Sequence, residues 1–90
     1  MAIAVYLHPP SMGAEQYDEI VRRLDEAGAA APPGRLHHSC FGTGNALMMY
    51  EIWDSQEAFA AYAETLGPIV QAAGVQLAGA HAMPVHNMID

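Results

Sequence analysis

The chain has 90 residues, of which 52% are hydrophobic, so we expect residues 1–90 to form one domain with a single core. Ten acidic residues against three arginines and no lysine give a formal net charge of −7. Because so few cations are available to neutralise phosphates, the composition argues against binding to nucleic acid or to an anionic membrane surface.

The cysteine content and the hydropathy of the chain bear on its location. Cys40 is the only cysteine, which excludes an internal disulfide and fits a reducing compartment. The N-terminal run MAIAVYLHPP has neither a basic segment nor a long apolar stretch, and no part of the sequence reaches the length of a membrane span. The sequence therefore predicts a soluble, cytoplasmic protein without a membrane partner.

The first predicted elements are a strand and an amphipathic helix. Residues Ala2–His8 form a short apolar run, which Pro9 and Pro10 stop because proline cannot continue a sheet ladder. From Gly13 to about Gly28, apolar side chains recur three and four positions apart, which is the spacing of one helix face. These side chains are Tyr17, Ile20, Val21 and Leu24.

The stretch Arg35–Asp54 predicts two strands joined by a tight turn, and it holds most of the side chains able to do chemistry. Its flanks are rich in β-branched and aromatic residues or alternate in polarity. Between them, Gly42-Thr43-Gly44-Asn45 supplies the positive φ angles that a short hairpin loop needs. Because side chains alternate across a strand, the register of this hairpin decides which of them share a face.

The position of the turn sets the pairs across the hairpin. With Gly44-Asn45 as the turn, His38 lies opposite Glu51 and Leu36 lies opposite Trp53. With the turn one residue earlier the pairs slide, but the same side chains still share one face, and only a bulge would break the grouping. The grouped side chains are His38, Cys40, Met49, Glu51 and Trp53.

A second helix and a final strand follow the hairpin. Asp54 or Ser55 can cap this helix, and its buried face comprises Phe59, Tyr62, Ala63 and Leu66. Gly67-Pro68 interrupts the pattern, so we expect a break before a short helical piece through Ile69–Ala73. Gln76–His86 alternates loosely and predicts the last strand.

The order β-α-β-β-α-β predicts an α+β, ferredoxin-like domain. We expect a four-stranded antiparallel sheet with helices on one face, and with the first and third strands central because both crossovers are right-handed. The uncovered face would carry more apolar surface than water tolerates, namely Tyr6, Phe41, Met48, Tyr50 and Ile52. Two copies meeting sheet to sheet would bury it, so the sequence predicts a homodimer.

A longer pattern runs through nearly the whole chain. A glycine and a histidine of the second strand, a small-residue turn, a strand ending in Trp-Asp-Ser and a helix with a Phe-x-x-Tyr core follow one another. The residues are Gly34, His38, Gly44, Trp53, Asp54, Ser55, Phe59, Tyr62, Leu66, Pro68 and Gly74. The pattern resembles that of the dimeric α+β barrel superfamily, in particular small stand-alone proteins related to the antibiotic biosynthesis monooxygenases.

This resemblance implies two copies joined as a dimeric α+β barrel and a reaction drawn from a wide range. Related barrels include cofactor-independent oxygenases acting on phenolic polyketides, haem-degrading enzymes, lactone isomerases and members without a known reaction. The oxygenases and the haem enzymes often place Asn and Trp around the pocket. Here Trp53 is present, but asparagine occurs only at Asn45 and Asn87, which argues against haem cleavage.

His38 is the residue best suited to chemistry, in a pocket expected between the sheet and its helices. An imidazole beside a carboxylate can act as a general base, with Glu51 holding its tautomer. The expected substrate-binding lining is Tyr17, Leu36, Cys40, Met49, Trp53 and Phe59. We predict oxygenation by dioxygen, or isomerisation, of a small aromatic or polyketide-like substrate without a cofactor.

Other interpretations remain open. The His38 and Glu51 pair could equally be a satisfied polar pair in an apolar sheet, and the same cavity could serve a non-catalytic, stress-related or apolar ligand-binding barrel. Methionines suit a tolerant pocket as well as an ordinary core. We expect no metal site, since adjacent His37 and His38 point to opposite faces of a strand and no zinc spacing includes His81 or His86.

Overall fold

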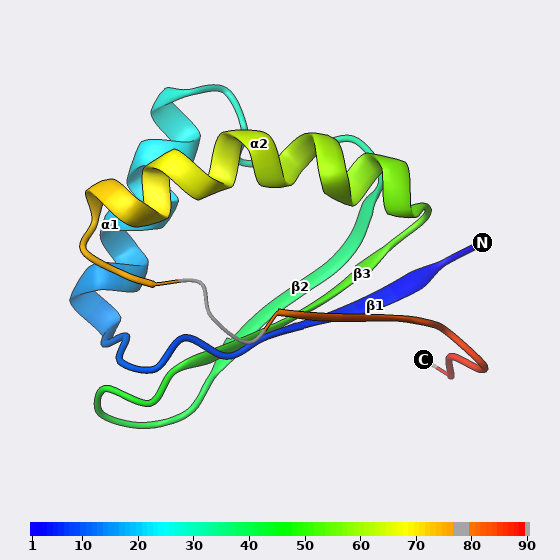
Figure 1. Cartoon of the computed structure of the whole chain (residues 1–90), viewed down its shortest axis with the longest axis horizontal. Coiled ribbons are helices and arrows are strands. Elements are labelled where there is room, and N and C mark those ends of the chain that lie inside the picture. Colours follow the sequence, from blue (N-terminus) through cyan, green and yellow to red (C-terminus); the bar gives the residue numbers. More distant parts are fainter. Residues whose placement is uncertain (77–79, 90) are drawn as a thin grey trace.

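The computed structural model describes residues 1–76 and 80–89. The elements in chain order are β1 (Ile3–Leu7), α1 (Ala14–Glu26), β2 (Arg35–Phe41), β3 (Met48–Trp53), α2 (Gln56–Ala72) and β4 (His81–Pro84). The strands are antiparallel and ordered β2-β3-β1-β4, and the two helices lie on one side of the sheet (Figure 1). This arrangement confirms the predicted ferredoxin-like fold, with the first and third strands central.

The core lies between the sheet and the helices. In β1, Ile3, Val5 and Leu7 are buried while the alternate side chains are half-buried, as expected for a strand with one covered face. Their partners on β3 include Trp53, which is 0% exposed. The larger aromatic and aliphatic side chains of both helices pack on this face: Ile20, Leu24, Tyr62, Leu66 and Val70.

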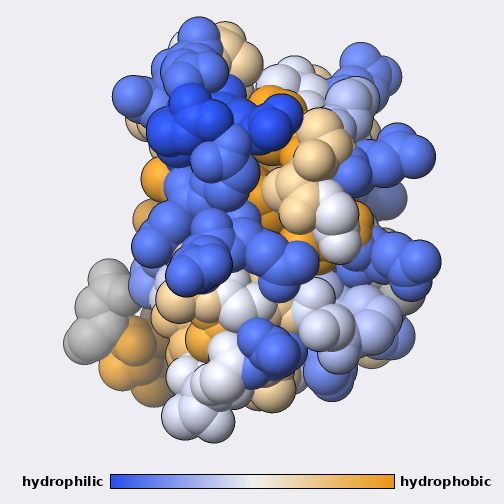
Figure 2. Space-filling model, turned by 90° about the vertical axis from the view of Figure 1, so that its left-hand side faces the viewer, coloured by the Kyte–Doolittle hydropathy of each residue, from blue (hydrophilic) through white to orange (hydrophobic). Residues whose placement is uncertain are grey.

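Helix α1 separates a charged side from an apolar one. Gly13 is its N-cap residue, and the Gly13 N–H donates to Gln16 Oε1 at 3.0 Å. On the solvent side, Glu19 forms ion pairs with Arg22 and Arg23. Figure 2 shows hydrophilic side chains over much of this end of the molecule, with a strip of apolar surface between them. Exposed pairs of this kind contribute little stability.

Helix α2 is continuous through Pro68, which corrects the predicted break at Gly67-Pro68. Ser55 Oγ caps its start by accepting the Ala58 N–H at 3.1 Å. Proline removes one intrahelical hydrogen bond, but Leu66 and Val70 on either side are buried in the core. Their packing holds the two turns in line, so tertiary contacts override the local breaking signal.

The last strand is shorter than the predicted Gln76–His86. Pairing between β1 and β4 runs from His81 to Pro84, while residues 77–79 lie outside the described residues. Pro84 has no N–H for the ladder, and the next contact is from the Val85 N–H to the Ala2 carbonyl at 3.0 Å. The proline therefore marks the end of regular pairing.

The hairpin has the register predicted for a turn at Gly44-Asn45. The Ala46 N–H donates to the Thr43 carbonyl at 3.0 Å across the turn, and Gly44 has a φ of +59°. Pairing then continues in step and places His38 opposite Glu51. The turn thus fixes which side chains meet in the first half of the hairpin.

A β-bulge between Arg35 and His37 corrects the predicted pairing of Leu36 with Trp53. Arg35 is the partner of Trp53 instead, so one extra residue separates it from the regular ladder. A shift of one position exchanges the faces of a strand. Leu36 is consequently 57% exposed and lies beside His37 in a depression on the uncovered face.

The uncovered face of the sheet is apolar. Its exposed residues include Leu36, Phe41, Tyr50 and Met83, at 57%, 44%, 37% and 67%. Ile52 is the exception at 3%, and it lies in a depression that residues 87–89 also line. Among the described residues, neither helix has the length and hydropathy needed to cross a bilayer.

Candidate active site

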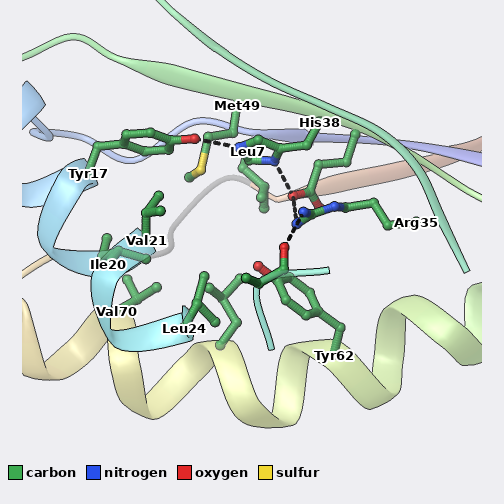
Figure 3. Close-up of a pocket in the computed structure, with 13 residues that line it drawn as sticks. Leu7, Tyr17, Ile20, Val21, Leu24, Arg35, His38, Met49, Tyr62 and Val70 are labelled. Carbon is green, nitrogen blue, oxygen red and sulfur yellow. Dashed lines mark hydrogen bonds and ion pairs between the residues drawn. The ribbon is translucent and has the colours of Figure 1, made fainter. Parts of the chain in front are cut away.

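A cavity of about 120 Å³ lies between the sheet and the two helices (Figure 3). Its lining comprises Leu7, Tyr17, Ile20, Val21, Leu24, Ala30, Arg35, His38, Met49, Glu51, Tyr62, Leu66 and Val70. Most of these side chains are aliphatic, and the polar groups gather beside β2 and β3. A dry protein cavity of about 150 Å³ accepts benzene, so this space is slightly smaller than one that holds a single small ring.

His38 and Glu51 form a close pair across β2 and β3. The distance from His38 Nδ1 to Glu51 Oε2 is 2.6 Å, and Glu51 Oε1 accepts the Trp53 Nε1–H at 3.0 Å. Glu51 is only 1% exposed. A carboxylate can only accept hydrogen bonds, so the neutral imidazole carries its proton on Nδ1 and has Nε2 as its acceptor. The pair has the arrangement of a base whose tautomer is held.

Tyr17 extends this pair into a hydrogen-bonded chain. Its hydroxyl lies 2.7 Å from His38 Nε2 (Figure 3). Because Nε2 is the acceptor, the phenol is the donor. Burial is the largest cause that raises the pKa of the Tyr17 hydroxyl, which keeps the phenol neutral and able to donate. Helix α1 thereby contributes a polar contact to the His38 and Glu51 pair of the sheet.

Arg35 brings a positive charge to the same cavity. Its side chain is 18% exposed, and Nη1 lies 3.8 Å from Glu51 Oε2. Nη2 donates to the Ala30 carbonyl at 2.9 Å, and Cζ lies 5.8 Å from the centroid of the Tyr62 ring. The guanidinium therefore compensates the buried carboxylate while it still lines the cavity.

Solved structures share this architecture, although no protein-family model and no curated protein sequence matches the chain. The N63A variant of SnoaB, a cofactor-independent oxygenase from Streptomyces nogalater, has a TM-score of 0.69 at 14% identity over 98% of this chain and 96% of its own. A candidate antibiotic biosynthesis monooxygenase from Chloroflexus aurantiacus has a TM-score of 0.66 at 21% identity, covering 98% and 97%. Rv0793 from Mycobacterium tuberculosis has a TM-score of 0.68 at 13% identity, covering 100% of both chains.

The chain has the fold of the antibiotic biosynthesis monooxygenase-like proteins. This confirms the resemblance predicted from the sequence. At these identities the likeness is one of backbone, so any chemistry has to be argued from the side chains of this chain itself.

The structure brings part of the predicted site together and separates the rest. Tyr17, His38, Met49 and Glu51 line the cavity between the sheet and the helices. Leu36 does not, because the bulge turns it to the opposite face, where it borders a different depression. Its predicted place in the lining is therefore wrong, and Arg35 occupies that place instead.

Trp53, Phe59 and Cys40 lie behind the cavity wall and do not line it. The Trp53 and Phe59 ring centroids are 5.6 Å apart, and the Trp53 indole supports Glu51 from inside the core. Cys40 is half-buried against the core, where burial raises the pKa of its thiol. Among these residues, Trp53 has a defined part in the site because it orients the carboxylate.

Sequence reasoning missed Arg35 and the role of Tyr62. Tyr62 was predicted on the buried face of the second helix, and burial with the nearby charge of Glu51 raises its pKa to about 12. The position of Arg35 in the cavity lining depends on the bulge, and the local signal for the bulge in the sequence is Gly34. This glycine has a φ of +88°, a conformation that other residues rarely adopt, directly before the strand begins.

The histidines do not gather. His37 lies beside the Tyr50 ring, with centroids 6.1 Å apart, while His38 faces the cavity. Across residues 1–76 and 80–89, no three His, Cys, Asp or Glu side chains are placed together as metal ligands.

Proposed function

We propose that this chain is a cytoplasmic, cofactor-independent oxygenase or isomerase in which His38 takes a proton from a small aromatic substrate. The observation that carries the proposal is the setting of His38: Nδ1 lies 2.6 Å from Glu51 Oε2, and the ring lines the cavity. In the neutral imidazole this contact places the proton on Nδ1 and the lone pair on Nε2. A general base needs this geometry before any other property. The description of SnoaB as a cofactor-independent oxygenase supports the general kind of reaction.

The proposed reaction begins when an acidic C–H or O–H of the substrate transfers its proton to His38 Nε2. Glu51 stabilises the imidazolium, and the Arg35 guanidinium stabilises the substrate anion. Addition of dioxygen to the carbanion gives a hydroperoxide, and loss of water leaves a carbonyl, so a CH₂ group and O₂ become a C=O group and H₂O. Return of the proton to another carbon instead gives an isomer.

The size of the cavity narrows the substrate class. A volume of about 120 Å³ is below the ~300 Å³ and more that is usual for sites of drug-sized ligands. A molecule with several fused rings would have to enlarge the cavity far more than a single substituted ring would. Of the two substrate types predicted from the sequence, the small aromatic one is favoured.

The proposal is tested by oxygen uptake and by hydrogen–deuterium exchange of one-ring phenols and enols. Replacing His38 by Ala should lower turnover by about 10²- to 10⁴-fold, because a positioned base contributes that much. The fold should persist, which thermal melting followed by circular dichroism would check. His37→Ala is the matched control, since the neighbouring imidazole lies on the uncovered face, and it should keep full turnover. Undiminished turnover in His38→Ala would refute the assigned base.

A second candidate is a non-catalytic binder of small apolar molecules. The specific observation in its favour is that the Tyr17 hydroxyl already occupies His38 Nε2, so the polar chain is satisfied without a substrate. In that case a bound ring would be recovered chemically unchanged, and His38→Ala would alter affinity without abolishing any conversion.

We also propose that two copies pair through their uncovered sheet faces. The exposed Leu36, Phe41, Tyr50 and Met83 form an apolar surface of the kind that marks an interface. Light scattering should give a homodimer at micromolar concentration. Phe41→Asp should shift the chain towards monomer, whereas Ala60→Asp, which adds the same charge on the exposed side of α2, should not. A monomeric wild-type chain would count against the pairing.

A further inference from the structure

The nitrogen that has to accept a substrate proton is already engaged. Tyr17 donates its hydroxyl to His38 Nε2 at 2.7 Å, while Glu51 holds Nδ1. Nε2 has a single lone pair in the ring plane, so it cannot accept a second hydrogen bond of this quality at the same time. A substrate hydroxyl can reach the base only after the phenol has left.

We propose, building on the proposed function, that Tyr17 is a displaceable cap on the base, so that a ligand hydroxyl must compete with the Tyr17 phenol for His38 Nε2. The Tyr17 hydroxyl therefore sets the hydrogen-bond strength that a ligand hydroxyl must exceed to reach Nε2. Hydroxyl groups that are better proton donors than tyrosine form stronger hydrogen bonds to the imidazole and can displace it, while weaker donors are held out. Tyr17 is then a specificity-determining residue and not the base itself.

The charges around Tyr17 agree with a neutral, exchangeable cap. Burial is the first cause that raises the pKa of its hydroxyl, followed by the neighbouring Cys40, Glu51 and Asp18, while Arg35 acts in the opposite direction. The phenol therefore stays protonated and can donate to Nε2 in the resting contact. A more acidic ligand hydroxyl at the same place would meet the same Arg35 charge once ionised.

The fold allows the cap to move without loss of the core. Tyr17 is half-buried on α1, whereas Ile20 and Leu24, which anchor this helix, are 2% and 7% exposed. Val21, on the same helix face, lines the cavity and is 43% exposed. Tyr17 and His38 also come from different elements and face each other from opposite sides (Figure 3). Rotation of the Tyr17 side chain outward would open Nε2 while α1 stays docked.

The test uses 4-nitrophenol, because its visible absorption reports whether the bound molecule is ionised. Tyr17→Phe keeps the ring but removes the competing hydroxyl, so it should bind 4-nitrophenol about five- to tenfold more tightly than the wild-type chain. 4-Methylphenol, which is the side chain of tyrosine as a free molecule, should gain the same factor. 4-Nitrotoluene has no hydroxyl and should gain nothing. Tyr50→Phe, on the uncovered face, is the control variant and should match wild type.

The outcomes separate the cap from the base. If Tyr17→Phe binds both phenols with unchanged or lower affinity, the cap is refuted while the role of His38 stands. If His38→Ala still binds and ionises 4-nitrophenol as wild type does, the base assigned under the proposed function is refuted. If neither wild type nor Tyr17→Phe binds either phenol, the hydroxyl-bearing ligand class is refuted. Circular dichroism melting of each variant confirms that it is folded.

Discussion

Glu51→Gln is expected to lower turnover by about 10³- to 10⁴-fold while the chain stays folded, as the corresponding acid-to-amide change does in a Ser-His-Asp triad. The carboxylate of Glu51 accepts from both neighbours: His38 Nδ1 at 2.6 Å and Trp53 Nε1 at 3.0 Å. An amide of the same shape has only one accepting oxygen. One of the two contacts must therefore invert.

The hydrogen bond that inverts is the one between residue 51 and the His38 imidazole. The Trp53 indole can only donate, so the amide oxygen stays with it and the amide NH₂ faces His38. Nδ1 then becomes the acceptor and the ring proton moves to Nε2. A ring protonated at Nε2 cannot take a proton from a substrate, which is why the loss should appear in turnover rather than in folding.

The measurement is kcat/KM for oxygen uptake or isotope exchange, together with urea unfolding of the same variant. Glu51→Ala is the informative comparison, because it also leaves Arg35 without the carboxylate 3.8 Å away and should destabilise the fold. Near-normal turnover in a folded Glu51→Gln chain would show that the tautomer of His38 has no part in the reaction.

Trp53→Ala is expected to reduce the free energy of unfolding by about 3 to 5 kcal/mol. The indole is 0% exposed, and its centroid lies 5.6 Å from that of Phe59 and 5.1 Å from that of Tyr62. Removing it leaves a large cavity and also removes the donor to Glu51. In a domain with total stability of roughly 5 to 13 kcal/mol, this loss removes a large share of the stability and should lower the melting temperature markedly.

Trp53→Phe separates the two contributions. The smaller ring keeps most of the packing with Phe59 and Tyr62, but Glu51 Oε1 loses its partner, which costs about 1 to 3 kcal/mol for a buried group. Urea unfolding of both variants gives the two values. If Trp53→Ala loses no more stability than Trp53→Phe, packing of the indole is not what holds this end of the core together.

The order of the elements and the hairpin register follow from local rules that the sequence carries. Alternation in the strands, helical spacing around Tyr17, and glycines at the turn are each sufficient to specify an element. Register propagates from the turn, so the His38 and Glu51 pairing could be derived by counting. Each of these features depends only on residues that are close together in the sequence.

Features that depend on distant packing could not be derived in this way. Pro68 lies inside α2 because Leu66 and Val70 are buried against the sheet, and no local signal reports that burial. The contact between Tyr17 and His38 joins α1 to β2, so it requires the docking of a helix whose position periodicity does not fix. Arg35 enters the cavity through a bulge set where the preceding loop joins the strand.

The β-bulge at Leu36 separates the two ends of the hairpin, so that a shift of the backbone at one end does not change the register at the other. From Phe41 to His37 the pairing is in step, so the turn side of the hairpin sets the positions of His38 and Glu51. A change in the length of the loop between α1 and β2 can be absorbed at the bulge, before the chain reaches His38. Variation in the length of that loop can consequently alter which side chain takes the place of Arg35 in the cavity. His38 and Glu51 would keep their positions.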